Sequence, residues 1–258
     1  MTDMQHGHPD DLLPGTGTLM QAEAGNWLLR CMHHQDYALL APFLQRVPIR
    51  TGDRLAQAGA TIDSVCFLES GVAAFLDVLD DGRQLAVGLL GREGFAGWPL
   101  VLGNDRWPHQ VIARGRDATA LRMEAADLLA AMRASPRLRD FLLRYVSTFL
   151  IQMSRTIVSN LIHPIEKRTA RWLLLYRDRL DSDDLAITHE ELGIMLGVRR
   201  ASVTEALHQL ESSGSIRGHR GRLLIRDRYA LAAAVEETYG QAEAEYRRLI
   251  WDPANRTG

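Results

Sequence analysis

The chain has 258 residues, of which 46% are hydrophobic and 24% are charged, so it is long enough for one large domain or two ordinary ones. This composition excludes a fibrous repeat and a largely disordered chain. The formal net charge is −2, yet the segment 199–228 holds seven arginines against three acidic residues, a local charge of +4 that leaves −6 for the rest. One basic surface that attracts polyanions is therefore expected.

The first 25 residues and the two cysteines bear on where the protein works. Residues 1–25 lack the basic start and apolar run of an export signal, and no segment forms an apolar stretch long enough to span a membrane. Cys31 and Cys66 are too few for a disulfide framework or a cysteine-rich metal cluster, which fits a reducing compartment. His6 and His8 offer metal ligands, but a flexible leader over 1–25 explains the segment better. We expect a cytoplasmic protein that enters no membrane and holds no metal.

Short helices are predicted within 27–45, and residues 47–123 then have the character of an antiparallel β-domain. Short apolar runs alternate there with glycines, a pattern typical of a compact barrel or sandwich; the runs lie at 64–68, 72–76 and 85–90. Asp80, Asp81 and Gly82 give the sharpest turn signal. We expect a type I′ hairpin there, in which both central residues take positive φ.

The pattern becomes helical near residue 124, and a long helix is predicted from 135 to about Leu161. Ser135 suits the N-cap, and Pro136 suits the first helical position, where its missing N–H costs nothing. The apolar stripe of this helix recurs at steps of three or four residues and comprises Leu138, Leu142, Tyr145, Phe149, Met153 and Ile157. Such a stripe fits a helix buried between domains or a parallel helix pair at a dimer axis. We expect the homodimer.

Pro164 should end the long helix, and residues 165–180 then form another one. Thr188 and Glu191 have the spacing of a capping box, which starts a short helix that ends near Gly197. A second helical pattern follows at i, i+3, i+4 and i+7, made by Val203, Ala206, Leu207 and Leu210. Because Gly197 can adopt the positive φ that a tight turn requires, a helix-turn-helix is predicted. The segment 216–225 adds two short strands, a basic wing.

Two arginines stand where the second of these helices begins, although the helix dipole disfavours cations there by roughly 0.3–1 kcal/mol. If this helix enters the major groove of double-stranded DNA, Arg199 and Arg200 gain charge-assisted contacts with phosphates and base edges. A bidentate arginine on guanine contributes about 1–3 kcal/mol of discrimination. The predicted DNA contacts are Arg199, Arg200, Ser202, Thr204, Glu205, Thr188 and Arg220. A solvated arginine pair is the alternative, but it leaves the capping box, the glycine and the wing unexplained.

Catalytic signatures are missing from the sequence, which contains no Gly-x-Ser-x-Gly elbow, no phosphate loop and no His-Glu-x-x-His pattern. We therefore do not expect an enzyme. Two other functions remain. The favoured one is a dimeric, sequence-specific DNA-binding transcriptional regulator, and the alternative is a nucleotide-binding signalling module that acts through protein–protein contacts. A steep loss of DNA affinity with added salt is expected only for the first.

The order of these elements, with the segment 188–216 as its most specific part, resembles the Crp/Fnr family of transcriptional regulators over roughly residues 30–235. The resemblance implies an α+β fold and a homodimer whose recognition helices enter successive major grooves of a palindromic operator about 34 Å apart, with RNA polymerase as a further partner. The implied parts are a flexible leader (1–25), a cyclic-nucleotide-binding-like β-roll sensor (26–134), a long dimerisation helix (135–163), a winged helix-turn-helix (164–240) and a C-terminal tail (241–258).

The reading helix departs from the pattern of the family. Arg200 matches the family's base-reading arginine, but Ala201 replaces the glutamate that follows it, and Glu205 stands where a further arginine often lies. The operator sequence is therefore left open, as are the target genes and the choice between activation and repression.

The sensor segment departs from the pattern of family members that bind cAMP. Those members carry Phe-Gly-Glu and then, about ten residues on, Arg-Ser or Arg-Thr; the carboxylate accepts from the ribose hydroxyl and the arginine pairs with the phosphate. The corresponding effector-pocket residues here are Gly97, Trp98, Arg106 and Trp107. Because Trp98 takes the place of the glutamate, the sequence argues against cAMP.

Residues of the sensor segment and of the leader also bear on the other effectors that the family uses. No cysteine precedes Cys31, which excludes the N-terminal iron–sulfur cluster of oxygen-sensing members. Haem would need His33, His34 or His109 as an axial ligand, and nothing in the sequence favours that role. Trp98 and Trp107 could stack on a cyclic dinucleotide, or they could fill a pocket that has lost its ligand. The sequence leaves these alternatives open.

Overall fold

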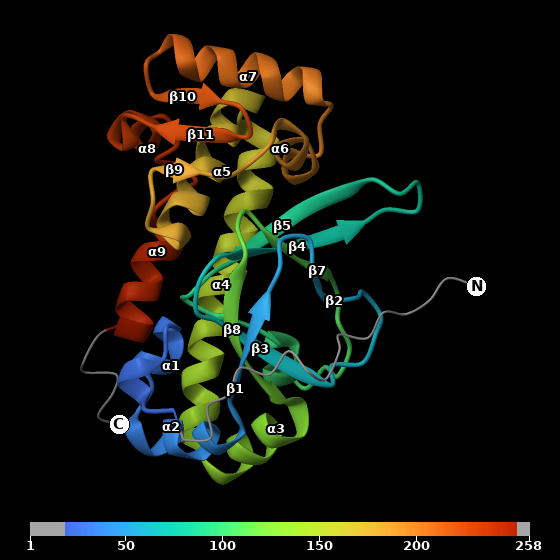
Figure 1. Cartoon of the computed structure of the whole chain (residues 1–258), viewed down its shortest axis with the longest axis vertical. Helices are drawn as coiled ribbons and strands as arrows, with labels where there is room; N and C mark the ends of the chain where they lie inside the picture. The colour runs from blue at the N-terminus through green and yellow to red at the C-terminus, as the bar shows by residue number, and fades with distance from the viewer. Residues whose placement is uncertain (1–18, 252–258) are drawn as a thin grey trace.

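The computed structural model describes residues 19–251 of the chain (Figure 1). His6 and His8 lie outside the described residues. The expected leader is wrong for residues 19–25, because these are held against the body of the protein. The Tyr37 hydroxyl donates to the Leu19 carbonyl at 2.9 Å, and the Gly25 N–H donates to Glu69 Oε1 at 2.9 Å.

Short helices precede the sheets, as predicted for 27–45. They are η1 (Gln21–Glu23), α1 (Trp27–Cys31), α2 (His34–Leu40) and η2 (Ala41–Phe43). Asn26 caps α1, since its side-chain oxygen accepts from the Leu29 N–H at 3.0 Å. The same amide donates to the carbonyls of Leu68 and Gly94, both at 2.8 Å, so one buried side chain fixes α1 on the β-domain.

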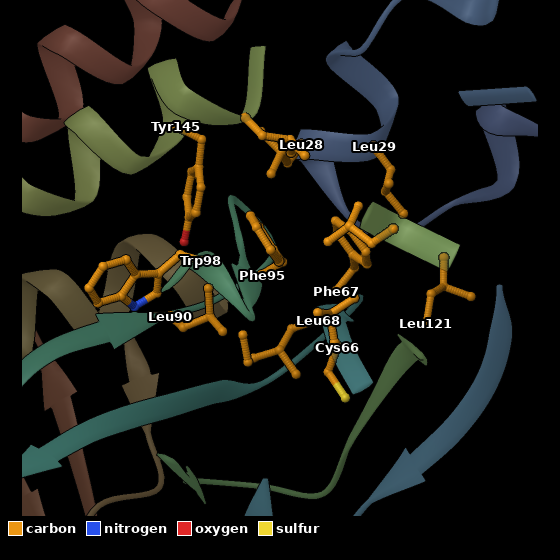
Figure 2. Packing of buried hydrophobic residues seen from close by; sticks show 14 of the residues in the cluster. Leu28, Leu29, Cys66, Phe67, Leu68, Leu90, Phe95, Trp98, Leu121 and Tyr145 are labelled. Atoms are coloured by element: carbon orange, nitrogen blue, oxygen red, sulfur yellow. The ribbon is translucent and has the colours of Figure 1, made fainter. Parts of the chain in front are cut away.

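Residues 45–124 form two four-stranded antiparallel sheets, which confirms the β-roll. One sheet has the order β1 (Gln45–Ile49), β8 (Ala118–Glu124), β3 (Ser64–Leu68), β6 (Phe95–Ala96), and the other has the order β2 (Arg54–Ala56), β7 (Gln110–Arg114), β4 (Val72–Val78), β5 (Gln84–Leu90). A short helix, η3 (Trp98–Leu102), follows β6. The apolar interior includes the stacked rings of Phe67 and Phe95, whose centroids lie 5.1 Å apart (Figure 2).

The hairpin between β4 and β5 exists, but its turn is not of type I′. Of the two residues expected at positive φ, Gly82 has φ +82°, whereas Asp81 does not have positive φ. The Leu79 N–H donates to the Arg83 carbonyl at 2.9 Å, and the Gly82 N–H donates back to the Leu79 carbonyl at 2.8 Å. This is the pattern of a three-residue loop in which glycine follows a type I turn. Such a loop requires positive φ at one residue, whereas a type I′ turn requires it at two.

The long helix α4 (Pro136–Ile162) follows α3 (Ala125–Ala134) and begins as predicted, with the Ser135 hydroxyl oxygen accepting from the Leu138 N–H at 3.2 Å. Its predicted dimer stripe is wrong in most positions. Leu138, Leu142, Tyr145 and Phe149 are at most 3% exposed within their own chain, Met153 is half-buried, and Ile157 is 61% exposed. The β-roll and the segment 241–251 already cover this face, so its buried members cannot also pair with a second helix.

A different stripe of α4 faces outward. It is called the outer stripe here and comprises Leu143, Ser147, Leu150, Ser154, Ile157 and Leu161. These residues recur at alternating steps of four and three, the spacing of a coiled-coil seam. Leu150 is 46% exposed and Leu161 is 79% exposed. The outer stripe is thus a largely apolar seam that residues 19–251 leave uncovered.

The C-terminal domain contains the predicted helix-turn-helix and wing. Its elements are α5 (Ile165–Leu180), β9 (Asp184–Leu185), α6 (His189–Leu196), α7 (Arg200–Ser212), β10 (Ile216–His219), β11 (Arg222–Ile225) and α8 (Arg228–Ala234). Its core is continuous with the outer surface of the sheet that holds β4 and β5. Val72, Leu76 and Leu89 of the β-roll belong to one buried cluster with Trp172 of α5 and Leu196 of α6. The two domains are therefore docked through apolar contacts.

A buried arginine strengthens this docking. Arg171 on α5 is 2% exposed, and burial lowers its pKa to about 10, so it is still protonated at neutral pH. Its guanidinium donates to the Thr238 carbonyl at 3.0 Å, to Thr156 Oγ1 at 3.1 Å and to the Gln152 carbonyl at 3.3 Å. Arg171 therefore joins the long helix, the C-terminal domain and the segment after α8.

The expected C-terminal tail is instead helical over 241–251. This segment, called the strap here, consists of α9 (Gln241–Tyr246) and the π-helical turn η4 (Arg247–Trp251). It runs beside α4 from the C-terminal domain back to α1 (Figure 1). The Tyr246 hydroxyl donates to the Glu93 carbonyl at 2.7 Å, and the rings of Trp251 and Trp27 meet edge to face at 5.8 Å. No helix within residues 19–251 is long and apolar enough to cross a membrane.

Candidate nucleic-acid interface and sensor pocket

The turn between α6 and α7 is built by the residues that the sequence singles out. Thr188 Oγ1 accepts from the Glu191 N–H at 3.1 Å, and the Thr188 N–H donates to Glu191 Oε2 at 2.8 Å, which completes the capping box of α6. Gly197 ends α6 with φ +65°, a conformation that costs other residues about 1–2 kcal/mol. The helix-turn-helix prediction is confirmed in its local geometry.

Helix α7 lies at the far end of the molecule from α2 and α3 (Figure 1), and its first turn is open to solvent. Arg199 occupies the N-cap without a capping side-chain bond, and Arg200 opens the helix. Both are exposed, and within residues 19–251 neither side chain has a hydrogen-bond or ion-pair partner. The two guanidinium groups at the positive end of the helix dipole are thus free to meet an anion.

Some of the other residues predicted to contact DNA already make hydrogen bonds within the protein. Thr204 Oγ1 donates to the Arg200 carbonyl at 3.1 Å and lies 3.0 Å from Nδ1 of His189, which joins α7 to α6. The hydroxyl of Thr188 serves its own helix cap. Ser202 is half-buried, and Glu205 is exposed, with its carboxylate 3.5 Å from the Gln209 side-chain nitrogen. The structure gives Thr188 and Thr204 local structural roles, whereas Glu205 remains accessible.

The arginines of the wing differ in whether they are paired with a carboxylate. Arg222 Nε donates to Asp184 Oδ1 at 2.8 Å, and this hydrogen bond holds the pKa of Asp184 below its ordinary value. This pair fixes β11 to β9. Arg217 and Arg220 are exposed, and within the described chain their side chains have no partner. Arg220 lies at the hairpin tip beside Gly221, which has φ +70°.

The interior of the β-roll, where the sequence places the effector pocket, is filled by aromatic side chains. Trp98 is 7% exposed, and its ring lies 5.8 Å from that of Phe149 on α4. Phe75 approaches the same Phe149 ring at 4.8 Å. Figure 2 shows Tyr145 of α4 pointing toward Trp98 and Phe95. Gly97 is tightly enclosed, since a Cβ there would lie 2.3 Å from Val65 Cγ1.

Arg106 does not join this interior. Its side chain is exposed, and Nη1 donates to the Gly59 carbonyl at 3.0 Å. Trp107 is 6% exposed, and its backbone bonds to the Gly59–Ala60 loop. The structure therefore buries both tryptophans but leaves the candidate phosphate-binding arginine on a surface loop. Sequence reasoning missed Phe75 and Phe149 as pocket-filling residues, because an aromatic residue in an apolar run gives no sign of what it packs against.

An exposed, arginine-tipped helix in a winged helix-turn-helix, docked on a β-roll, defines a DNA-binding protein with a sensor domain. Two family models match the chain accordingly. A cyclic nucleotide-binding domain matches residues 46–135, and a Crp-like helix-turn-helix domain matches residues 167–234, together more than half of the chain. A search of curated proteins with this sequence found no match.

Several solved structures share the fold. A transcriptional regulator of the Crp/Fnr family from Eubacterium rectale is 18% identical, with a TM-score of 0.64 over 81% of this chain and 97% of that chain. FixK2 from Bradyrhizobium japonicum is 17% identical, with a TM-score of 0.65 over 74% and 96% of the two chains. CLP from Xanthomonas campestris, a c-di-GMP-responsive global regulator, is 16% identical, with a TM-score of 0.62 over 74% and 98%. The chain belongs to the Crp/Fnr family and is a DNA-binding transcriptional regulator.

Proposed function

We propose that the protein acts as a homodimer that reads a palindromic operator through α7 and regulates RNA polymerase in the cytoplasm, without catalysing a reaction. The observation that carries the proposal is the exposed arginine pair at the start of α7, which has no partner within the described residues. In a two-fold dimer, two such helices would enter major grooves about 34–36 Å apart.

The test of DNA reading uses fluorescence anisotropy of the full-length protein on the half-sites that genomic footprinting yields. Arg200→Ala should relax discrimination at one base pair per half-site by about 1–3 kcal/mol. Arg220→Ala should weaken binding to all DNA sequences evenly, and it should reduce the slope of log affinity against log salt concentration by about one unit. Arg133→Ala is the control, because this exposed residue on α3 loses the same charge far from α7. Weak, salt-insensitive binding to every duplex would contradict the proposal.

The dimer proposal rests on the outer stripe of α4. Leucine and isoleucine at one seam position alternate with Ser147 and Ser154, whose small side chains let a second helix approach closely. Leu150→Glu should give monomers in sedimentation velocity, since two carboxylates would face each other at the seam, and palindrome binding should be lost with the dimer. Leu39→Glu on α2, a similarly half-exposed leucine off the stripe, is the control. An intact Leu150→Glu dimer would remove the outer stripe from the interface.

We also propose that the interior of the β-roll is closed to cyclic nucleotides. Trp98 and Phe149 occupy it, and Arg106 is held on the Gly59 carbonyl, so neither the ribose nor the cyclic phosphate has its usual partner. The Phe149 ring beside Trp98 also leaves less room for a cyclic dinucleotide to stack there, and His109, a candidate axial ligand of haem, lies 2.6 Å from Asp77 Oδ1. A thermal-melting titration with cAMP should leave Tm unchanged, because a ligand that does not bind the native state cannot stabilise it. A saturable rise in Tm would contradict this.

A further inference from the structure

A second pocket lies outside the interior of the β-roll, at the junction of the two domains. It has a volume of about 470 Å³, within the usual range of small-molecule sites. Its walls come from four parts of the chain, namely Glu93 of the sensor, Gln152 of α4, Arg179 of α5 and Trp251 of the strap. Trp98, Arg106 and Trp107 do not line it. It shares Tyr145 and Phe149 with the interior of the β-roll, but it includes none of the effector-pocket residues that the sequence indicates.

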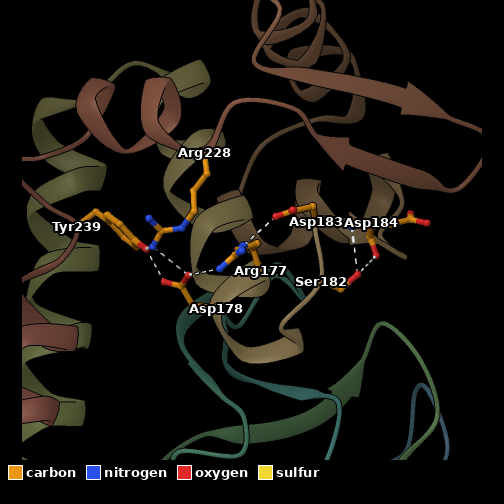
Figure 3. Close-up of polar contacts among 7 residues, drawn as sticks. All are labelled: Arg177, Asp178, Ser182, Asp183, Asp184, Arg228 and Tyr239. Carbon is orange, nitrogen blue, oxygen red and sulfur yellow. Dashed lines mark hydrogen bonds and ion pairs between the residues drawn. The ribbon is translucent and has the colours of Figure 1, made fainter.

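The polar wall of this pocket is held in place by a network around Asp178 (Figure 3). Arg228 Nη2 donates to Asp178 Oδ1 at 3.2 Å, and the Tyr239 hydroxyl donates to the other oxygen of the same carboxylate. Arg177 Nε donates to Asp183 Oδ1 at 2.9 Å. Because the side chains are fixed before any ligand arrives, little conformational entropy would be lost on binding.

A buried ion pair crosses the domain boundary at the same place. Arg179 Nε lies 2.8 Å from Glu93 Oε1, and the Arg179 side chain is 7% exposed. Burial acts to lower the pKa of Arg179, but the carboxylates of Glu93, Glu243 and Asp178 outweigh it, so the net pKa is raised. The pocket therefore keeps a charged guanidinium in a partly desolvated wall, where electrostatic attraction to an anion is strong.

Three buried polar atoms of the lining residues have no hydrogen-bond partner within residues 19–251, and one of them, Arg179 Nε, belongs to the ion pair with Glu93. Glu93 Oε2 and Arg228 Nε are buried, and neither has a hydrogen-bond partner within residues 19–251. One is an acceptor on the sensor and the other is a donor on the C-terminal domain. A buried polar group left unpaired costs about 1–3 kcal/mol. Both atoms expose less than 1 Å², so a ligand that donates to Glu93 and accepts from Arg228 would recover part of this cost by displacing the side-chain atoms that cover them.

The remaining lining sets the chemistry of that molecule. Six aromatic side chains line the pocket: Trp27, Tyr145, Phe149, Tyr239, Tyr246 and Trp251. The charged lining residues are four arginines and three carboxylates, and Asp183, outside the lining, neutralises Arg177. Arg247 is exposed and has no ion-pair partner within residues 19–251. Flat rings stack well against such walls, and a single negative charge on the ligand would pair with Arg247.

We propose that this junction pocket binds a small aromatic acid with one negative charge and an N–H or O–H donor. Resting on the proposed function, we further propose that this ligand regulates DNA binding. Because residues from both domains and the strap surround the ligand, its binding would stabilise one relative placement of the sensor and the helix-turn-helix. A population shift requires a ligand with such a difference in affinity between two arrangements.

The probe is 1-anilinonaphthalene-8-sulfonate, an aromatic monoanion with an N–H donor, titrated into the full-length protein by calorimetry and fluorescence. Ala242 lines the pocket and is half-buried, whereas Ala244 on the same helix is exposed and does not line it. Ala242→Trp should weaken binding about tenfold or more because the indole occupies the pocket, and Ala244→Trp should not. Cooperative thermal unfolding of both variants shows that they are folded.

Saturable binding of one probe molecule per chain that is lost only in Ala242→Trp would support the site. No saturable binding, or equal binding by both variants, would overturn it and would indicate that water alone fills the pocket. A saturating probe should change operator affinity about threefold or more in the Ala244→Trp control but not in Ala242→Trp. Probe binding with unchanged DNA affinity would overturn the regulatory role. Salt-dependent DNA binding without probe tests the proposed function separately.

Discussion

Replacement of Gly197 by alanine should destabilise the protein through two effects that can be measured apart. Gly197 forms the turn of the helix-turn-helix with φ +65°. An ideal Cβ at this position would lie 2.0 Å from Cδ2 of Leu85, on the hairpin of the sensor. The glycine therefore serves both the backbone of the turn and the close approach of the two domains.

The backbone effect of Gly197→Ala is about 1–2 kcal/mol, the cost of a left-handed conformation for an L-residue. The contact with Leu85 adds about 1 kcal/mol, the lower end of the range for overpacking, because the end of a leucine side chain can rotate away. The total of about 2–3 kcal/mol corresponds to a fall in Tm of roughly 4–12 °C for a chain of this size.

Gly214 supplies the matched control, because it has φ +77° and no described heavy atom lies within 4 Å of its ideal Cβ. Gly214→Ala should cost only the backbone part, about 1–2 kcal/mol. Urea unfolding followed by circular dichroism measures each variant, and a double-mutant cycle with Leu85→Ala isolates the contact. If Gly197→Ala costs no more than Gly214→Ala, or if Leu85→Ala gives no relief, the sensor hairpin does not press on the turn and the reasoning is refuted.

Two further predictions concern buried ionisable groups. Burial alone would raise the pKa of Asp36, but hydrogen bonds from Arg137 at 2.8 Å and Ser135 at 2.7 Å outweigh it and keep the pKa below its ordinary value. The stabilisation is therefore present above the unfolded pKa of about 4 and is lost as the pH falls through the lower folded value. Asp36→Asn should lower the free energy of unfolding by about 2 kcal/mol in urea at pH 7, and the difference from the wild type should shrink near pH 3. An equal difference at both pH values would count against the pairing. Burial raises the pKa of the Cys66 thiol to about 11. At pH 8 this thiol should therefore react with iodoacetamide only when denaturant is present. Rapid labelling of Cys66 in the native protein, located by mass spectrometry, would contradict this prediction.

Local signals in the sequence predicted the helix boundaries and the DNA-reading motif. The Ser135 cap, the capping box of Thr188 and Glu191, and the break at Pro164 are all present as expected. Each depends on atoms no more than about four residues apart, so the information needed is contained in a short segment. Gly197 was predictable for the same reason, since the positive φ belongs to the turn itself.

Features that depend on distant neighbours could not be predicted in this way. Apolar residues surround much of α4, and the periodicity does not tell which face meets the β-roll; the buried stripe holds Tyr145 and Phe149, and the uncovered one holds Leu150 and Leu161. The strap was missed because its folding depends on contacts with α1 and α4. Tyr246 reaches the carbonyl of Glu93 from 153 positions away in the chain.

The sequence by itself determined that a β-roll and a winged helix-turn-helix exist and that basic residues gather on the latter, because composition, caps and turn residues act locally. Only the tertiary structure decided which arginines have a carboxylate partner among residues 19–251. Arg199 and Arg200 project into solvent, Arg222 is paired with Asp184 on β9, and Arg179 is paired with Glu93 across the domain boundary. An arginine carries the same charge at every position, and its role depends on whether folding brings a carboxylate beside it or leaves its charge for another molecule.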